Sequence, residues 1–158
     1  MTFDAIDQHI LSILRDDGRA SHATIAKRVG LSGPAVGERV RKLEGLGVIR
    51  GYRAVFDAEA LGRGVCAYVS IAPQPRYPAA NLVENLGPLP EIEELHAVAG
   101  EHGYIAKVRV ASTQKLDSFL DRLWMVEGVE RTQTTVILRT TVDRPMHLAF
   151  GDGTGEPV

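Results

Sequence analysis

Positively charged side chains cluster in one stretch of the sequence, between residues 19 and 50. This stretch holds seven Lys and Arg residues against two acids, Glu38 and Glu44, and carries a net charge of +5. Residues 51–158 carry −4, and the whole chain carries −2. Such a basic segment can neutralise the phosphates of a nucleic acid, but surface charges also cluster by chance. Charge alone favours neither interpretation, so the elements that position the cations must decide.

Three short helices are predicted around these cations. The first covers residues 4–16, with Asp4 as its N-cap, because apolar residues recur there at helical spacing. The second begins after Ser21 and stops at Gly30, which suits the left-handed conformation found at helix ends. The third begins after Ser32 and ends near residue 45.

The second and third helices are predicted to form a helix-turn-helix over residues 21–46. Ala26, Gly30 and Val36 have the spacing that a steep crossing with a tight glycine turn requires. Together with the basic third helix, this favours DNA binding over a purely structural hairpin. Contacts to double-stranded DNA are expected from Lys27, Arg28, Ser32, Gly33, Pro34, Gly37, Glu38, Arg39, Arg41 and Lys42.

These residues are expected to divide between base readout and phosphate contact. Base readout is expected from Ser32, Glu38, Arg39 and Arg41. Phosphate contact is expected from Lys27, Arg28 and Lys42. An arginine bidentate to guanine is worth about 1–3 kcal/mol of discrimination, whereas phosphate contacts add affinity and salt dependence. A structural salt bridge within the helical domain is an equally open role for Arg39.

The start of the third helix offers few hydrogen-bonding side chains. Gly33, Pro34 and Gly37 are expected to point outward. One interpretation is a thin helix face that lets the backbone approach the major-groove floor. The other is a weak helix held by tertiary packing, because a mid-helix glycine costs about 1 kcal/mol relative to alanine.

The rest of the chain predicts an α+β fold. Strands are expected near 65–71, 92–98, 104–110 and 129–138, with helices near 82–86 and 112–124, in the β-α-β-β-α-β order of the ferredoxin-like motif. We therefore expect four segments: an N-terminal three-helix helix-turn-helix domain (1–50), an extended connector (51–63), a C-terminal ferredoxin-like βαββαβ domain (64–142) and a tail (143–158). The tail is expected to dock loosely or not at all.

Two helices on one face of a four-stranded sheet leave the other face uncovered. Cys66, Tyr68, Ile105 and several threonines are expected on that face, which makes it a natural homodimer surface. A dimer would carry two helix-turn-helix domains, as paired operator half-sites require.

Several classes of protein are disfavoured by composition. Cys66 is the only cysteine, so neither an internal disulfide nor a cysteine-rich metal site is expected, and nothing suggests a cofactor. No apolar run approaches the ~18 residues of a membrane span, and the first residues lack a secretion signal. A cytoplasmic protein without a membrane partner is expected.

The sequence also resembles a known family over residues 4–142. The residues that carry the resemblance are Ile6-Asp7, Ile10-Leu11, Leu14, Asp17-Gly18-Arg19, Ile25-Ala26, Val29-Gly30-Leu31-Ser32, Val36, Arg39-Val40, Leu43-Glu44, Gly47-Val48-Ile49 and Gly51-Tyr52. They are similar to the Lrp/AsnC "feast/famine" regulators. The resemblance implies a transcription regulator rather than an enzyme, and a dimer that commonly assembles further into tetramers or octamers. It also implies an amino acid or related small effector bound between sensor domains.

A second resemblance concerns the sensor domain, where Val98-Ala99-Gly100-Glu101, Tyr104 and Lys107-Val108 are similar to the family's motif. The implied effector site consists of Val98, Ala99, Gly100, Glu101, His102, Gly103, Tyr104, Thr132, Thr134 and Thr135. Gly103 stands where the family usually has an acid that helps to hold the effector's amino group, and charged hydrogen bonds contribute about 1.5–3 kcal/mol. Either Glu101 or His102 takes over this role, or the effector is not an ordinary amino acid, or there is none.

Two alternative functions remain from the sequence. A nucleoid-type protein with low sequence specificity is mildly favoured by the small residues of the third helix. An enzyme of the same two-part architecture, resembling decarboxylases of siroheme-type tetrapyrroles, would use His96 and His102 as acid/base groups or porphyrin contacts. The basic third helix argues against the enzyme.

Overall fold

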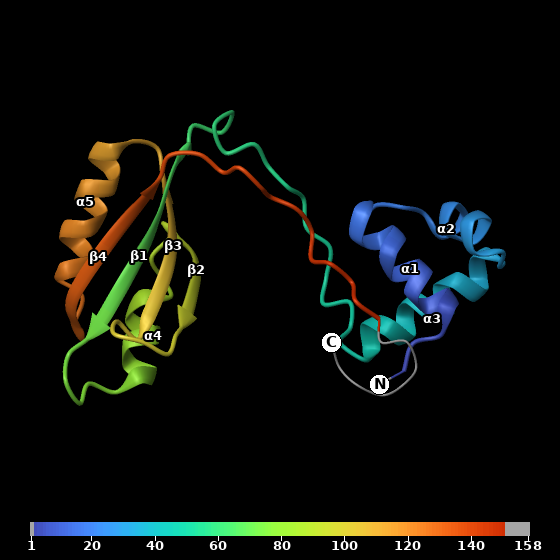
Figure 1. Ribbon diagram of the computed structural model, residues 1–158, viewed down its shortest axis with the longest axis horizontal. Coiled ribbons are helices and arrows are strands. Elements are labelled where there is room, and N and C mark those ends of the chain that lie inside the picture. Colours follow the sequence, from blue (N-terminus) through green and yellow to red (C-terminus); the bar gives the residue numbers. More distant parts are fainter. Residues whose placement is uncertain (1, 151–158) are drawn as a thin grey trace. The chain divides into compact units, whose positions relative to one another are not determined.

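The computed structural model describes residues 2–150 and divides them into two compact units (Figure 1). The first, here the helical unit, comprises residues 2–55 together with 142–150. The second, here the sheet unit, comprises residues 56–141. The chain therefore leaves the helical unit after Val55 and re-enters it at Val142.

The helical unit contains the three predicted helices. They are α1 (Ala5–Asp16), α2 (His22–Val29) and α3 (Gly33–Gly45). Each begins at a side chain that accepts a hydrogen bond from a first-turn N–H, and these caps are Asp4, Ser21 and Ser32. Gly30 ends α2 with a φ of +72°, as the turn between α2 and α3 requires. The predicted helix-turn-helix is confirmed.

The residues directly after α3 belong to the helical unit. Val48 and Ile49 pack against its core, which includes the fully buried Ile10, Ile25 and Val36. Tyr52 lies on Gly18: a Cβ at that glycine would be 3.6 Å from the Tyr52 ring. The Tyr52 hydroxyl donates a 3.1 Å hydrogen bond to Glu44 of α3, so the chain stays attached to the helices at least to this residue.

The described part of the tail also packs on the helical unit. Leu148 and Phe150 lie against its core, and the Phe150 ring meets Phe3 edge-to-face with centroids 6.4 Å apart. The prediction of a loosely docked or undocked tail is therefore wrong for these two residues. Their apolar side chains thus add to the packing around the core, and Phe150 does so through its contact with Phe3.

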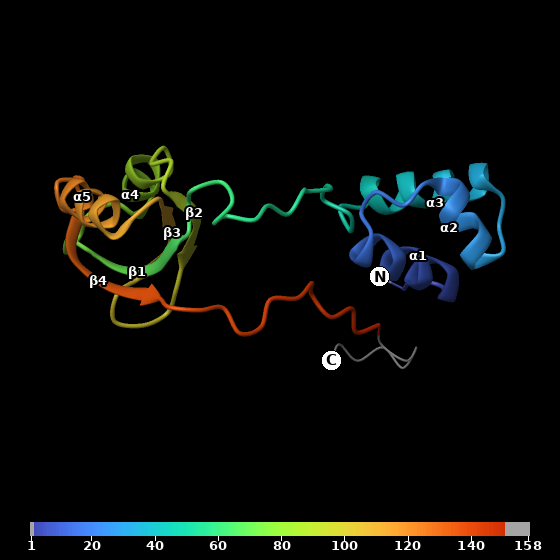
Figure 2. The same ribbon diagram turned by 90° about the horizontal axis from the view of Figure 1, so that it is seen from above.

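The sheet unit has the predicted βαββαβ order. Its elements are β1 (Val65–Pro73), α4 (Ala79–Leu86), β2 (Ile92–Ala97), β3 (Tyr104–Val110), α5 (Thr113–Trp124) and β4 (Val129–Ile137). The strands form one antiparallel sheet in the order β2-β3-β1-β4, and both helices lie on the same face of it (Figure 2). The ferredoxin-like prediction is confirmed.

Alternation along the strands separates a buried face from an open face. On β3, Ala106 and Val108 are fully buried beneath the helices, where Phe119 of α5 packs. On the other face the register pairs Cys66 with Arg109, Tyr68 with Lys107 and Ser70 with Ile105. The expected placement of Cys66, Tyr68 and Ile105 on the face away from the helices is confirmed.

A tight turn joins α5 to β4. Gly128 in this turn has a φ of +94°, and a Cβ built there would overlap carbons of the Tyr77 ring. Asn85 holds this ring in place, since its Nδ2 donates to the Tyr77 hydroxyl and to the carbonyl of Glu127. Glycine is thus required here by both its backbone conformation and its surroundings.

Two features are absent from residues 2–150. No helix in this range is long and apolar enough to span a bilayer. Likewise, this part of the chain holds no cluster of three or more His, Cys, Asp or Glu side chains arranged to hold a metal ion.

Candidate nucleic-acid interface and effector loop

The exposed surface of α2 and α3 carries most of the predicted DNA contacts. Their side chains lie away from the core formed by Ile25, Val36 and Val40. The exposed members are Lys27, Arg28, Ser32, Pro34, Glu38, Arg41 and Lys42, and Gly33 is half-buried. Hydroxyl Oγ of Ser32 caps α3 by accepting from the N–H of Ala35, 3.3 Å away.

Several cations of the sheet unit are paired with glutamates, whereas, among the described residues, four cations of α2 and α3 are not. In the sheet unit Lys107, Arg109, Arg122 and Arg131 all pair with glutamates. Among residues 2–150, by contrast, no carboxylate lies within ion-pair distance of Lys27, Arg28, Arg41 or Lys42. These four exposed cations of α2 and α3 are thus available to an external anion.

Gly37 does not belong to this surface. It is buried, and a Cβ built on it would lie 3.1 Å from Nδ1 of His22, the first residue of α2. The prediction that Gly37 points outward is therefore wrong. The reason is the crossing of α2 over α3, which places the His22 ring where any larger residue at 37 would stand.

Arg39 contacts α1. Its Nη1 lies 2.6 Å from Oδ2 of Asp4 and 2.7 Å from Oδ1 of Asp7, whose side chain is only 6% exposed. The N–H of Asp7 and then the Arg39 guanidinium hold the pKa of Asp4 below its usual value. The structural salt bridge that the sequence left open for Arg39 is thus present, and it ties α3 to the beginning of α1.

The loop between β2 and β3 contains most of the predicted effector site. The N–H of Val98 donates to the carbonyl of Gly103 over 2.8 Å and closes the loop. Gly103 has a φ of +78°, and a Cβ there would approach Cδ of Pro73 to 3.3 Å. A side chain at this position would be strained and would crowd Pro73, so glycine suits this backbone.

Glu101 connects this loop to β4. Its carboxylate accepts a 2.8 Å hydrogen bond from Arg131, and both side chains are largely exposed. Tyr104, by contrast, is buried in the core of the sheet unit and faces the helices. Of the residues predicted for the loop itself, only Tyr104 is thus turned away from solvent.

The three predicted threonines of β4 do not share one face. Thr132 and Thr134 pair with Ile71 and Val69 and lie on the helix-covered side, whereas Thr135 lies on the open side. Oγ1 of Thr132 accepts a 2.6 Å hydrogen bond from the indole of Trp124. These two residues line a shallow cavity of about 170 Å³ whose other walls are Val129, Glu130 and Arg131.

Sequence reasoning missed Trp124 and Arg131. Trp124 falls at the end of the helix predicted near 112–124, and it is 62% exposed there. Its position as the last residue of α5 is the one signal that could have indicated this. For Arg131 the signal is weaker, because its pairing with Glu101 joins two residues 30 positions apart.

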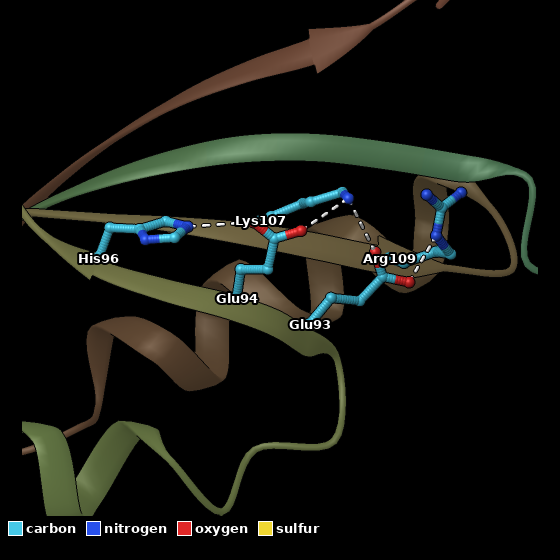
Figure 3. Close-up of polar contacts among 5 residues, drawn as sticks. All are labelled: Glu93, Glu94, His96, Lys107 and Arg109. Carbon is cyan, nitrogen blue, oxygen red and sulfur yellow. Dashed lines mark hydrogen bonds and ion pairs between the residues drawn. The ribbon is translucent and has the colours of Figure 1, made fainter. Parts of the chain in front are cut away.

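Polar contacts occupy the β2–β3 half of the open face (Figure 3). Glu94 accepts from Lys107 over 2.9 Å and lies 3.0 Å from Nε2 of His96, while Arg109 donates to Glu93 over 2.6 Å. These bonds lower the pKa of Glu94 and raise those of Lys107 and Arg109. The negative charges of Glu93 and Glu94 balance the positive charges of Lys107 and Arg109, and the His96 ring lies within hydrogen-bond distance of Glu94.

A basic helix-turn-helix unit joined to a ferredoxin-like unit with an exposed glycine-rich loop defines a class of two-part DNA-binding regulators. Family models for the AsnC-type helix-turn-helix domain and the Lrp/AsnC ligand binding domain match residues 3–44 and 66–146. The chain belongs to the Lrp/AsnC family of transcription regulators, and this confirms the resemblance seen in the sequence.

Individual relatives agree with this assignment. The HTH-type transcriptional regulator LrpA of Mycobacterium tuberculosis is 39% identical over 92% of this chain and 96% of its own length. The HTH-type transcriptional regulator FL11 of Pyrococcus horikoshii is 36% identical over 87% and 90%. A solved structure of the feast or famine regulatory protein from M. tuberculosis, complexed with L-methionine, superposes with a TM-score of 0.87 at 39% identity and covers 92% of this chain and 99% of its own.

Proposed function

We propose that this regulator binds specific sites on double-stranded DNA as a homo-oligomer, and that an amino acid or related small metabolite changes its assembly or its DNA affinity. The observation that carries the DNA-binding part is the surface of α2 and α3, where Lys27, Arg28, Arg41 and Lys42 make no described ion pair. Neutralising phosphates with such cations releases counterions and supplies most of the affinity.

Within this surface, Pro34, Glu38 and Lys42 lie on the side of α3 opposite its buried residues. They face the major groove in a helix-turn-helix complex, with Gly33 and Ser32 at the N-terminal end that usually approaches the bases. Lys27 and Arg28, near the end of α2, contact phosphates. Arg39 acts as a positioning residue, because its bonds to Asp4 and Asp7 orient α3 rather than read the DNA.

Self-association uses the open face of the sheet. Tyr68 is 43% exposed there, beside Ser70 and Thr135, and these uncharged residues can be buried against a second copy. In the β2–β3 half of the open face, Lys107 and Arg109 pair with glutamates of the same chain. This half therefore carries no unpaired charge from these residues that a second copy would have to neutralise. A dimer, with octamers as higher assemblies, presents two helix-turn-helix units to paired half-sites.

The effector is proposed to bind at the β2–β3 loop. With Gly103 in place of an acid, Glu101 is the carboxylate available to an α-ammonium group, and Arg131 is its exchangeable partner. The L-methionine complex of the M. tuberculosis relative makes an amino acid the first class to test. No catalytic role is assigned to His96 or His102.

The test combines a ligand screen with DNA binding. The twenty amino acids are screened by thermal shift, because a ligand that binds only the folded state raises its stability. Any hit is then added to a binding assay on a duplex selected by the protein from a random pool. We expect one amino acid to shift both the melting temperature and the DNA affinity; no shift from any of the twenty would overturn the amino-acid proposal.

Two further measurements sharpen this test. Gly100 has open space around its Cβ position and a φ of +151°, so Gly100→Leu should abolish the effector response and leave basal DNA binding intact. A response that survives would place the effector elsewhere. A ratio of specific to non-specific affinity below about 10³ at fixed salt would favour a nucleoid-type protein instead.

A further inference from the structure

A hollow of about 230 Å³ lies within the helical unit, between the connection from α1 to α2 and one flank of α3. Its walls include three nitrogen-bearing side chains, Arg19, His22 and Arg41. Arg19 and His22 were not among the predicted DNA contacts. Arg41 was expected to read a base, but it lines this hollow on the flank of α3 rather than standing at the helix N-terminus.

The charges around the hollow are unbalanced. Among the described residues neither Arg19 nor Arg41 forms an ion pair. Glu44 is the one acid of the lining, and its Oε1 accepts a hydrogen bond from Tyr52. With two guanidinium groups and one carboxylate, the walls carry a net charge of +1 when His22 is neutral.

We propose that this hollow is the seat of one backbone phosphodiester of the bound DNA, held jointly by Arg19 and Arg41. A phosphodiester carries a single negative charge, which the net charge of the walls matches. Arginine is suited to this role because its planar fork binds phosphate oxygens in a bidentate manner. The inference rests on the proposed DNA-binding function and changes the role of Arg41 from base readout to phosphate contact.

The surroundings fix the shape of the seat. His22 packs on Gly37, with its Nδ1 3.1 Å from the glycine's Cβ position, and this holds the beginning of α2 against α3. On the other side the Tyr52 ring covers Gly18, and its hydroxyl holds the Glu44 carboxylate. Both arginines therefore project from elements whose spacing is set by packing.

The experiment measures how affinity depends on salt, using the full chain and two probes. One probe is a random-sequence duplex, and the other is a duplex selected by the protein from a random pool. Affinity is measured by fluorescence anisotropy from about 50 to 200 mM salt, where each neutralised phosphate adds about 0.9 to the slope of log K against log salt. The variants are Arg19→Ala, Arg41→Ala and the double variant. Arg15→Ala is the matched control, since it removes a guanidinium of the helical unit that is paired with Asp16 and lies outside the hollow.

We expect the double variant to lose about 0.9 from the slope on both probes, and each single variant to lose no more than this, because the two arginines share one phosphate. Arg15→Ala should leave the slope unchanged. A loss of about 1.8 in the double variant, an unchanged slope, or relaxed preference at one base pair in Arg41→Ala would each overturn the shared seat. If the wild type binds neither duplex, the proposed function itself fails.

Discussion

Replacing Arg39 by alanine tests whether this residue holds the recognition helix in place or reads DNA. The substitution removes two charged hydrogen bonds, to Asp4 and to Asp7. The bond to Asp4 is exposed, and exposed pairs contribute about 0.2–1 kcal/mol. The bond to Asp7 weighs more, because its carboxylate would remain 94% buried without a partner.

The size of the effect follows from these exposures. Breaking one side of a fully buried pair costs about 3–5 kcal/mol. The Arg39 side chain is 30% exposed, so water can partly replace it, and we expect a loss of about 2–3 kcal/mol. By the same reasoning the Asp7→Ala, Arg39→Ala double variant should recover part of this loss, since no buried charge is left unpaired.

Hydrogen exchange measured by mass spectrometry reports this loss locally. Peptides from α1 and α3 should exchange about 30- to 150-fold faster in Arg39→Ala, because each 1.4 kcal/mol corresponds to a factor of ten. Peptides from the sheet unit provide the internal control. Unchanged exchange in α1 and α3, together with weaker or less selective DNA binding, would refute the positioning role and return Arg39 to base readout.

Three further predictions concern other parts of the chain. Gly128→Ala should lower the free energy of unfolding of the sheet unit by about 2–5 kcal/mol in urea, because the alanine would have a strained positive φ and would clash with Tyr77. Gly47→Ala has open space around its Cβ position and should lower the stability of the helical unit by only about 1–2 kcal/mol. Equal losses in the two variants would exclude the clash. Phe150→Ala should cost the helical unit about 1–2 kcal/mol, seen as faster exchange in α1 but not in the sheet, and no change would show that the tail contact is dispensable. The pKa of Asp4 is lower in the folded protein than its ordinary value of 3.8, so the ionised Asp4 stabilises the helical unit at pH values above 3.8. This contribution to stability is lost as the pH falls from 3.8 through the folded pKa. In an acid titration of unfolding, Asp4→Ser should keep the helix cap and lack this loss.

How far the sequence predicted this molecule depended on the distance between interacting residues. The caps Asp4, Ser21 and Ser32 act within three residues of themselves, and strand alternation is equally local, so helices, turn and sheet followed from pattern alone. The outward placement of Gly37 failed because its contact, His22, lies fifteen positions away across the turn. The spacing of apolar residues indicates which face of a helix is buried, but it does not identify the residue of another helix that packs on a given position.

The candidate sites show the same division. The exposed cations of α2 and α3 were predictable, because the helical pattern indicates which residues face solvent. The partners of Arg39 and Arg131 were not, since they lie 35 and 30 positions away and depend on how elements pack. The faces of Thr132 and Thr135 were not separated either, although strand alternation with a period of two would have done so.

The packing of Phe150 against Phe3 affects how the helical unit folds during synthesis on the ribosome. A ribosome adds about 5–20 residues per second, and N-terminal domains usually fold first. Phe150 lies 95 positions after Val55, so about 5–20 s pass between the emergence of the three helices and the arrival of this side chain, which packs against their core. During that interval the nascent chain already displays its basic helices, while Phe3 lacks its aromatic partner Phe150. The packing of the helical unit is thus completed only after the whole sheet unit has been synthesised.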